Sequence, residues 1–567
     1  MANAVRLRGA VLIPPLIYLV LVILATFPFV LDPHQTLTAP LGGDVAGSVS
    51  KFQTLVREGG NPFVVTHLVT IGYPDGVTLQ PGVDRVAFLN TGFLWGLSLL
   101  FGAVSAHGLM TLLGFWLTAT IMFLFVRRVT GSIGAGLVAG MAYGFWPHMY
   151  LIAAAAPTYT HMWMYILPVW AWLELALDPN RGRALLAGLA PVPAIFWTPY
   201  YLLHVVVIVG ACFLVVAARA FATRQVGLRA IGLAAIALMI PALAVGGSEL
   251  ILALSGHTGV PIRAVEDAFQ ESAHPLMYLV PGHDSIWGGK PYRFLVRAVP
   301  RAQNANLYVG LSALILAIVG TAAAVREIVR RRALALSSPA VLATLLGLAV
   351  VIACFVFSLP PRLAHNGPPM PDALVVAVQP AFRAGQRFVM PLMGGLAILA
   401  GLGSSLVLRR ISSPRLAPVV AVLLALVVGL DLFARPTDGL AGKPEGVATI
   451  PQSSALAALA KQPPGPTFQV VDRTAASPIH GVVPCLIQPQ HGKVVIETCG
   501  LGPWTLDYLR WSNSRSCDSF VDMRNHGVRY VIVDAAVAAL TACDQGNLAG
   551  SVARVAADDL FVIYGLG

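Results

Sequence analysis

The chain has 567 residues, of which 57% are hydrophobic and 11% are charged, and its formal net charge is +11 at neutral pH. With a mean hydropathy of +0.75, this composition excludes an ordinary soluble globular protein. Apolar runs of about 20 residues recur along the chain without the alternation of barrel strands, which predicts helices that span a membrane.

The first apolar run, 11–31, follows Arg6 and Arg8 and ends without a small-residue cleavage site. We therefore interpret it as a retained anchor and not as a signal peptide. With this run we predict eleven spans in all. The other ten lie near 107–126, 132–152, 162–177, 184–200, 202–218, 230–254, 305–325, 338–358, 387–408 and 416–434.

Clusters of arginine follow alternate spans, with few acidic residues among them. They are Arg127/Arg128, Arg181/Arg183, Arg219/Arg224/Arg229, Arg326/Arg330/Arg331/Arg332 and Arg409/Arg410/Arg415. The positive-inside rule predicts that these clusters and the N-terminus lie in the cytoplasm. An odd number of crossings must then separate Arg8 from Arg128, so the apolar run 86–104 is predicted to lie along the outer interface. The positive charge thus indicates topology, and it gives no reason to expect nucleic acid.

The segment after the last span, 436–567, is predicted to be a small extracytoplasmic α/β domain, since short β-type runs alternate with helical ones. The transmembrane domain would then be 1–435, with outer loops 32–106, 255–304 and 359–386. Four of the six cysteines fall in the tail, namely Cys485, Cys499, Cys517 and Cys543. This clustering favours two disulfides in an oxidising compartment over a metal site, because no CxxC or paired histidine accompanies it. Of the three possible connectivities, we predict the one that pairs sequence neighbours, Cys485 with Cys499 and Cys517 with Cys543.

Ionisable groups in the outer segments are the candidates for a functional site. Asp44 follows the first span and two glycines, where it could serve as a base or simply cap the next helix. Asp75 stands in a turn sequence that favours a purely structural role. The remaining candidates are His148, His161, Asp284, Arg293, Arg383 and Arg387.

Two alternatives bear on these candidates. His161 lies beside aromatic residues and could be part of an interfacial belt. Arg383 and Arg387 precede a span on its outer side, against the usual charge bias, which favours a phosphate-binding role for them.

The order of these segments resembles the GT-C superfamily of integral membrane glycosyltransferases, and more narrowly a group of bacterial proteins related to the YfhO type. The resemblance is carried by Gly43-Asp44 with Gly60–Phe63, Tyr73–Gly76, Arg127–Ser132, His161 before Leu167-Pro168, Tyr308–Leu311, Phe382–Phe388 and Gly527–Asp534. It implies a GT-C fold with Asp44 at the catalytic position of the first outer loop. A second acidic residue, frequent in that superfamily, is not evident at 153–161, where His148 and His161 stand nearby.

Sugar transfer outside the membrane would require a polyprenyl-phosphate sugar as donor and a cell-envelope glycan, lipid or protein as acceptor. A divalent cation such as Mg²⁺ or Mn²⁺ could assist the departing phosphate. The expected location is a bacterial cytoplasmic membrane, with the tail outside. The rival interpretations are a flippase or transporter of lipid-linked glycans or envelope lipids, and a non-catalytic assembly protein. A carrier would place ionisable groups near the bilayer midplane, where this sequence has few.

Overall fold

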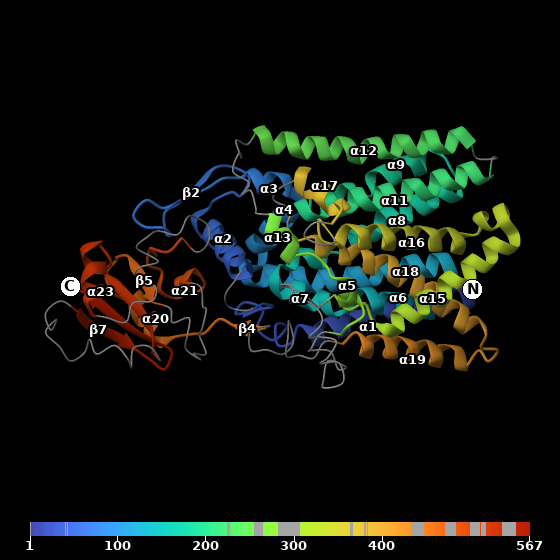
Figure 1. The fold of residues 1–567 in the computed structure, drawn as a ribbon. Helices are drawn as coiled ribbons and strands as arrows, with labels where there is room; N and C mark the ends of the chain where they lie inside the picture. The colour runs from blue at the N-terminus through green and yellow to red at the C-terminus, as the bar shows by residue number, and fades with distance from the viewer. Residues whose placement is uncertain are drawn as a thin grey trace.

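The computed structural model describes most of the chain and consists of a helical bundle with a sheet-bearing part at one end (Figure 1). The described residues are 2–39, 41, 44–223, 227–254, 265–281, 307–362, 367–378, 382, 384–433, 447–470, 484–498, 511, 517–535 and 552–567. All structural statements below concern these residues.

Six helices are long and apolar enough to cross a membrane. They are α5 (Ala103–Thr130), α11 (Pro199–Thr223), α12 (Gly227–Leu254), α15 (Leu311–Arg331), α16 (Pro339–Ser358) and α18 (Val389–Arg409). The other helices of the bundle are α1 (Ala2–Ala25), α4 (Phe88–Phe101), α6 (Ile133–Gly144), α8 (Trp163–Leu177), α9 (Arg181–Leu189), α10 (Val192–Ile195) and α19 (Leu416–Asp431). The chain is thus a multi-pass membrane protein, and the count of eleven spans stays a prediction.

Two predicted spans are not single helices. The run 132–152 divides into α6 and α7 (Pro147–Ala155), with Phe145 and Trp146 between them. Proline lacks the backbone N–H that would continue the ladder, so Pro147 begins a new helix. The run 184–200 is likewise broken between α9 and α10, where Pro191 stands. The run 86–104 forms α4, which Gly102 separates from α5 by adopting a φ of 81°. Its interfacial location stays a prediction.

Helix α18 lies at the centre of the bundle, and α12 and α19 lie at its edges (Figure 1). Glycines allow the close approach of α18 to α15. A Cβ atom on Gly403 would overlap the backbone oxygen of Leu316, and one on Gly320 would lie 2.6 Å from the backbone oxygen of Leu399. Small residues at such crossings are what van der Waals packing between membrane helices requires.

Replacing Gly403 with valine should therefore force α15 and α18 apart and destabilise the protein by about 1–3 kcal/mol, the usual cost of overpacking. The same change at Gly246 of α12, where a Cβ atom would meet nothing within 4 Å, is the matched control. Thermal unfolding of the two variants in detergent, followed by size-exclusion chromatography, measures the difference. Equal melting temperatures would contradict the packing argument.

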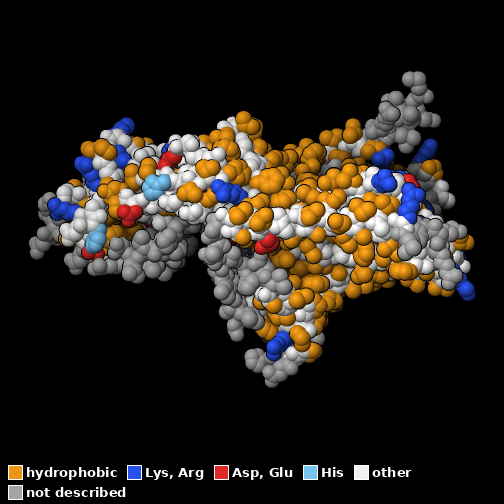
Figure 2. Space-filling view, turned by 90° about the horizontal axis from the view of Figure 1, so that it is seen from above, with side chains coloured by type: hydrophobic (Ala, Val, Ile, Leu, Met, Phe, Trp, Pro, Cys, Tyr) orange, Lys and Arg blue, Asp and Glu red, His pale blue; other side chains and the backbone are white. Residues whose placement is uncertain are grey.

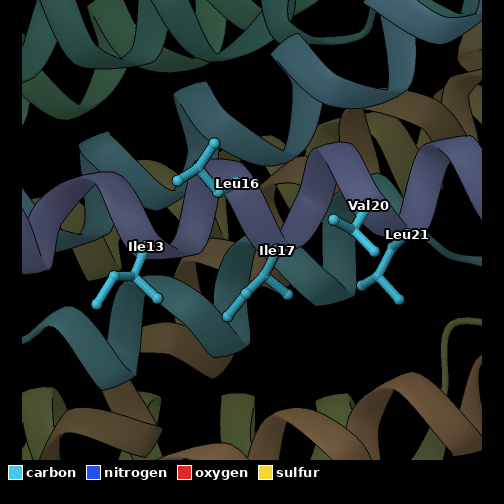
Figure 3. Close-up of a pocket in the computed structure, with 5 residues that line it drawn as sticks. All are labelled: Ile13, Leu16, Ile17, Val20 and Leu21. Atoms are coloured by element: carbon cyan, nitrogen blue, oxygen red, sulfur yellow. The ribbon is translucent and has the colours of Figure 1, made fainter.

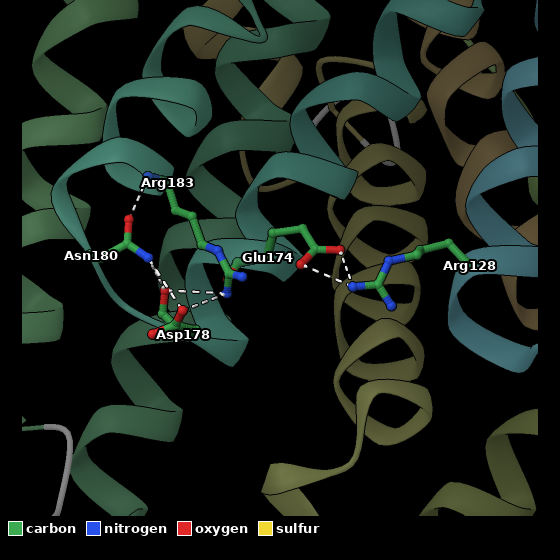
Figure 4. A network of polar contacts seen from close by, with 5 residues as sticks. All are labelled: Arg128, Glu174, Asp178, Asn180 and Arg183. Atoms are coloured by element: carbon green, nitrogen blue, oxygen red, sulfur yellow. Dashed lines mark hydrogen bonds and ion pairs between the residues drawn. The ribbon is translucent and has the colours of Figure 1, made fainter.

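Apolar and charged side chains occupy different parts of the surface along the length of the bundle (Figure 2). An apolar belt covers its middle, Lys and Arg gather at the end remote from the C-terminal sheet, and mixed charges cover the sheet-bearing end. At the arginine-rich end, a polar network joins three helices (Figure 4). Arg128 of α5 pairs with Glu174 of α8 at 3.2 Å, and Arg183 of α9 pairs with Asp178 at 3.2 Å. The Asn180 side chain caps α9 by accepting from the Arg183 backbone N–H at 3.0 Å.

The other end carries short elements from the loops that the sequence predicts to lie outside the membrane. They are β1 (Thr36–Leu37), α2 (Asp44–Glu58), β2 (Thr66–Leu68), β3 (Val77–Leu79), α3 (Gly82–Val86), α13 (Val265–Gln270), α17 (Pro371–Val378) and the 3-10 helices at Pro157–Thr160, Pro275–Tyr278 and Gly385–Phe388. A further 3-10 helix, Arg332–Ser337, lies between α15 and α16.

A four-stranded sheet forms the C-terminal part, in the order β5-β6-β8-β7. Its strands are β5 (Thr467–Val470), β6 (Tyr530–Asp534), β7 (Val552–Ala557) and β8 (Phe561–Leu566), and only β5 and β6 run parallel. The accompanying elements are β4 (Ala448–Thr449), α20 (Ser454–Ala460), α21 (Pro484–His491) and α23 (Cys517–Asn525). The β-type runs predicted at 467–471, 528–533 and 560–564 coincide with β5, β6 and β8. The run predicted at 493–497 forms only isolated bridges through Val495, and β7 was not predicted. That 436–567 is a domain of its own stays a prediction.

Candidate functional site

Arg387 lies in the short helical turn that leads into α18, and two tyrosine rings enclose its guanidinium group. The guanidinium carbon is 4.8 Å from the ring centre of Tyr159 and 4.3 Å from that of Tyr200. Its Nη1 donates to the Tyr159 hydroxyl at 3.2 Å. Tyr159 comes from the turn after α7 and Tyr200 from the first turn of α11. Three outer segments therefore meet at this one cation.

No carboxylate of the described residues pairs with Arg387, which uses a single hydrogen bond of the five that its N–H groups can donate. Guanidinium groups that are partly buried usually find an anion within the protein. Stacked between two rings, this one keeps a fixed orientation while its remaining donors stay free. Such an arrangement is suited to binding an external anion, a phosphate group above all.

Two buried histidines lie within electrostatic range of Arg387. His148, in the first turn of α7, is fully buried, and neither of its ring nitrogens has a hydrogen-bond partner. His204 of α11 bonds through Nδ1 to the Tyr165 hydroxyl at 2.6 Å, whereas its Nε2 has no partner. Unpartnered buried nitrogens are costly. Their presence on both α7 and α11 indicates a site that is completed by something other than protein.

A buried carboxyl group lies behind the Arg387 turn. Asp372, in the first turn of α17, is only 1% exposed, and neither of its carboxyl oxygens has a partner. A Cβ atom on Gly385 would lie 3.1 Å from one of these oxygens. On the same turn, Gln386 donates from Nε2 to Glu271 Oε2 at 3.0 Å and from its backbone N–H to the Glu271 backbone oxygen at 3.0 Å. Glu271 therefore holds the turn by two hydrogen bonds, and the Asp372 carboxyl group packs against it at Gly385.

Burial raises the pKa of Asp372 to about 7. Because the folded state then binds this proton more tightly than the unfolded chain, stability should fall as pH rises from about 4 to about 7 and level off above that. Asp372→Asn removes the titrating group, so the variant should lose less stability than the wild type between pH 5 and pH 8. Thermal unfolding of both proteins at the two pH values measures this. An identical loss in both would show that Asp372 does not titrate in this range.

Asp44 is the first residue of α2, and its side chain is exposed. No backbone N–H of the described residues donates to its carboxylate, so the alternative that Asp44 merely caps the helix finds no support in the geometry. A free, exposed carboxylate at this position remains available to a substrate. Among the described residues, no hydrogen bond or ion pair joins Asp44 to Arg387 or His148, although α2 contacts α7.

The other predicted site residues divide into two groups. His161 bonds through both ring nitrogens, at 3.1 Å to the Met110 backbone oxygen and at 3.1 Å from the Trp163 indole N–H, which favours a packing role. Asp75 is exposed in the turn between β2 and β3, as a turn former would be. Asp284, Arg293 and Arg383 lie outside the described residues. No three potential metal ligands meet in the described part of the chain, and the binding of Mg²⁺ or Mn²⁺ stays untested.

The structure thus brings His148 and Arg387 together and adds residues that the sequence analysis did not select as site residues. These are Tyr159, Tyr200, His204, Glu271 and Asp372. The sequence contained a usable signal for Asp372. Its carboxyl group directly precedes the apolar run Ala373–Val378, so burial of this group in an apolar environment could have been predicted. The tyrosines gave no such signal, because aromatic residues are common at any membrane interface.

The cysteines agree in part with the sequence analysis. Cys212 of α11 and Cys354 of α16 are buried and free. Cys485 of α21 is disulfide-bonded, while the side chains of Cys499, Cys517 and Cys543 lie outside the described residues. The pairing of Cys485 with Cys499 therefore stays a prediction.

A groove of about 300 Å³ follows α1 and has no polar lining (Figure 3). The side chains that line it are Ile13, Leu16, Ile17, Val20 and Leu21. Since the groove offers no group for acid–base chemistry or anion binding, it is not a candidate for the reacting centre.

No family model and no curated protein matches this sequence. Solved structures of GT-C glycosyltransferases do resemble it. ArnT from Cupriavidus metallidurans, bound to undecaprenyl phosphate, matches with 15% identity and a TM-score of 0.48 over 97% of each chain. AglB, the oligosaccharyltransferase of Archaeoglobus fulgidus, in complex with an inhibitory peptide and a dolichol-phosphate, matches with 12% identity and a TM-score of 0.45 over 92% of this chain and 69% of its own.

The arabinofuranosyltransferase AftD from Mycobacteria matches over 99% of this chain, with 16% identity and a TM-score of 0.51. This chain spans 40% of the length of AftD. At such low identity the likeness concerns the fold alone, and the narrower YfhO-type grouping is not among these findings. The chain therefore has the membrane fold of the GT-C glycosyltransferases.

Proposed function

We propose that this protein is a glycosyltransferase that moves a sugar from a polyprenyl-phosphate donor to a cell-envelope acceptor on the extracytoplasmic face. The observation that carries the proposal is the Arg387 guanidinium, which is oriented by two tyrosines and has no carboxylate partner among the described residues. A donor phosphate is the anion that this geometry fits in a GT-C membrane fold.

The residues would divide the reaction between them. Asp44 would accept the proton of the acceptor hydroxyl as its oxygen forms a bond to the anomeric carbon of the sugar. The bond between that carbon and the phosphate oxygen breaks, and the electron pair leaves with the polyprenyl phosphate. Arg387 would stabilise the negative charge that the phosphate gains. His148 and His204 could supply hydrogen bonds to donor or acceptor, since their free nitrogens have none within the described protein.

The topology of the proposal follows from the charge distribution. Arginines gather at the end of the bundle remote from the C-terminal sheet (Figure 2), and the positive-inside rule would place that end in the cytoplasm. The Arg387 turn, α2 and the sheet would then lie outside a bacterial cytoplasmic membrane. The donor and acceptor of ArnT, AglB or AftD are not thereby assigned to this chain. Membership of the YfhO-type group is likewise part of the proposal.

The test is a comparison of envelope glycans between the source strain and a strain that lacks this gene. Mass spectrometry of the purified glycans, lipids and surface proteins should show one sugar substituent missing in the deletion strain and restored by the wild-type protein. If every envelope sugar is retained, the transferase assignment fails. A transporter would also cause loss of a sugar, but its effect would not depend on the Asp44 carboxylate.

A further inference from the structure

The end of α2 remote from Asp44 is tied to a neighbouring strand segment by a dense set of hydrogen bonds. The Glu58 carboxylate accepts from the backbone N–H groups of Val69 at 2.9 Å and Thr70 at 3.1 Å, and also from the Thr70 hydroxyl. Arg57 donates to the same hydroxyl. The side chains of Arg57 and Glu58, both in the last turn of α2, therefore both form hydrogen bonds with Thr70.

Thr70 is in turn held by the C-terminal part of the chain. Gln488 of α21 donates from Nε2 to the Thr70 backbone oxygen at 2.7 Å, and its Oε1 accepts from Arg57 at 2.9 Å. Gln488 is only 1% exposed, although it reaches out of its own helix to residues more than 400 positions earlier. Its amide group thus joins α2 and Thr70 in a single contact.

The backbone extends this connection into the sheet. Val495 N–H donates to the Thr70 backbone oxygen at 2.9 Å, Tyr73 N–H to the Val495 oxygen at 3.2 Å, and Gly72 N–H to the Glu497 oxygen at 3.2 Å. Val495 forms parallel bridges with Ile71 on one side and with Thr467 of β5 on the other. The first outer loop is therefore added to the C-terminal sheet at its β5 edge.

A helix transmits such a constraint along its length. From Asp44 to Glu58, α2 is about 21 Å long at 1.5 Å per residue. Two further contacts secure it on the way, one from Ser48 to His107 Nε2 of α5 at 2.9 Å and the other an ion pair of Lys51 with Asp84 at 2.6 Å. The first turn of α2 has no comparable side-chain bond at Asp44 among the described residues. The placement of Asp44 thus depends on how the rest of α2 is held, namely on the burial of Val45 and Ala46 beside it and on the contacts farther along the helix.

We propose that the C-terminal part positions the catalytic helix, and that Gln488 is the positioning residue through which it acts. This inference rests on the proposed function, because it gives α2 the task of presenting Asp44 to the acceptor. Gln488 touches no reacting atom in this arrangement. It holds Arg57 and Thr70 in place, and these hold α2.

The test compares Gln488→Ala with Gln490→Ala in the full-length protein. Gln490 is a control on the same helix, since its side chain makes two hydrogen bonds, both within the C-terminal part, to Ser453 and Pro451. The Gln488 side chain makes three, to Arg57, to the Thr70 backbone oxygen and to the Lys493 backbone oxygen, and only the first two reach the first loop. Hydrogen exchange of the α2 amides, measured by mass spectrometry in lipid nanodiscs, should accelerate at least about tenfold in Gln488→Ala. The variant loses two hydrogen bonds to Arg57 and Thr70, and about tenfold is the effect expected for one lost buried hydrogen bond. The exchange should not change in Gln490→Ala.

A second pair of variants approaches the same contact from α2. Arg57→Ala should accelerate exchange in α2 as Gln488→Ala does, and Arg57→Lys, which keeps one donor, should restore part of the protection. This pair decides the question if Gln488→Ala fails to fold. In the deletion strain, variants whose α2 amides are less protected from hydrogen exchange should also restore less of the envelope sugar.

The outcomes are distinct from those that test the proposed function. Unchanged exchange of α2 in both Gln488→Ala and Arg57→Ala would overturn the inference, whatever the activity. Faster exchange with full restoration of the sugar would also overturn it, since the orientation of α2 would then not matter for transfer. Failure of the proposed function would instead appear as full activity of an Asp44 variant.

Discussion

Replacing Asp44 with asparagine should abolish sugar transfer and leave the protein folded in the membrane. Asparagine keeps the size of the side chain but cannot accept a proton at neutral pH, so the contribution of general base catalysis, about 10²- to 10⁴-fold, is lost. The side chain is exposed and accepts no hydrogen bond from the described residues. Stability should therefore change by no more than about 0.5 kcal/mol.

The measurement is complementation of the deletion strain with wild type, Asp44→Asn or Asp559→Asn, each brought to the same level in the membrane. Asp559 is a matched control because its carboxylate is also exposed and without a partner among the described residues. The missing sugar should return with wild type and Asp559→Asn only. Its return with Asp44→Asn would remove Asp44 from the mechanism and favour a transporter or a non-catalytic assembly protein.

Replacing Arg387 with alanine should weaken transfer by about 10²- to 10³-fold, the usual cost of removing one group that stabilises the charge of a transition state. Alanine removes the guanidinium from between Tyr159 and Tyr200 and leaves no other cation in contact with those rings in the described residues. The transfer activity of Arg387→Lys should lie below that of the wild type and close to or above that of Arg387→Ala, because an ammonium group cannot stack between the rings or bind phosphate in a bidentate manner.

Binding of polyprenyl phosphate by native mass spectrometry, together with restoration of the sugar in the deletion strain, measures this effect. Arg410→Ala serves as the control, since Arg410 is exposed at the opposite end of α18. Both readouts should fall in Arg387→Ala and stay at the wild-type level in Arg410→Ala. If lipid phosphate binds equally to all variants, the anion at Arg387 is not the donor phosphate.

The sequence predicted the membrane class and most of the long helices because uncharged apolar runs of this length are typical of helices that cross a bilayer. It also offered a physical reason to choose Arg387 as a candidate, since a cation on the predicted outer side of a span opposes the usual bias; its role as a site residue stays a prediction. The sequence did not show that Tyr159 would contact an arginine 228 positions later. A single sequence carries no information on which outer turns meet, because that depends on how the spans pack.

The join between the first loop and the C-terminal sheet was also beyond prediction. It depends on backbone groups of Thr70, Tyr73 and Val495, and backbone pairing at the edge of a sheet leaves little pattern in the side chains. The break between α6 and α7 could have been predicted from Pro147, which ends the preceding helix. We placed a continuous span there because hydrophobicity continues through the proline.

The connection between Thr70 and Gln488 also orders events during synthesis. The two residues are 418 positions apart, so at 5–20 residues per second the first outer loop would wait roughly 20 to 80 s for its partner strand to be made. In the proposed topology, the hydrogen-bonding groups of Thr70 to Tyr73 are unpaired with the C-terminal segment during that interval and open to chaperones or proteases outside the membrane. If the C-terminal part supports α2 as we propose, the helix that bears Asp44 reaches its final support only after residues 484–497 have crossed. Nascent chains shorter than this should then be inactive even when every span is inserted.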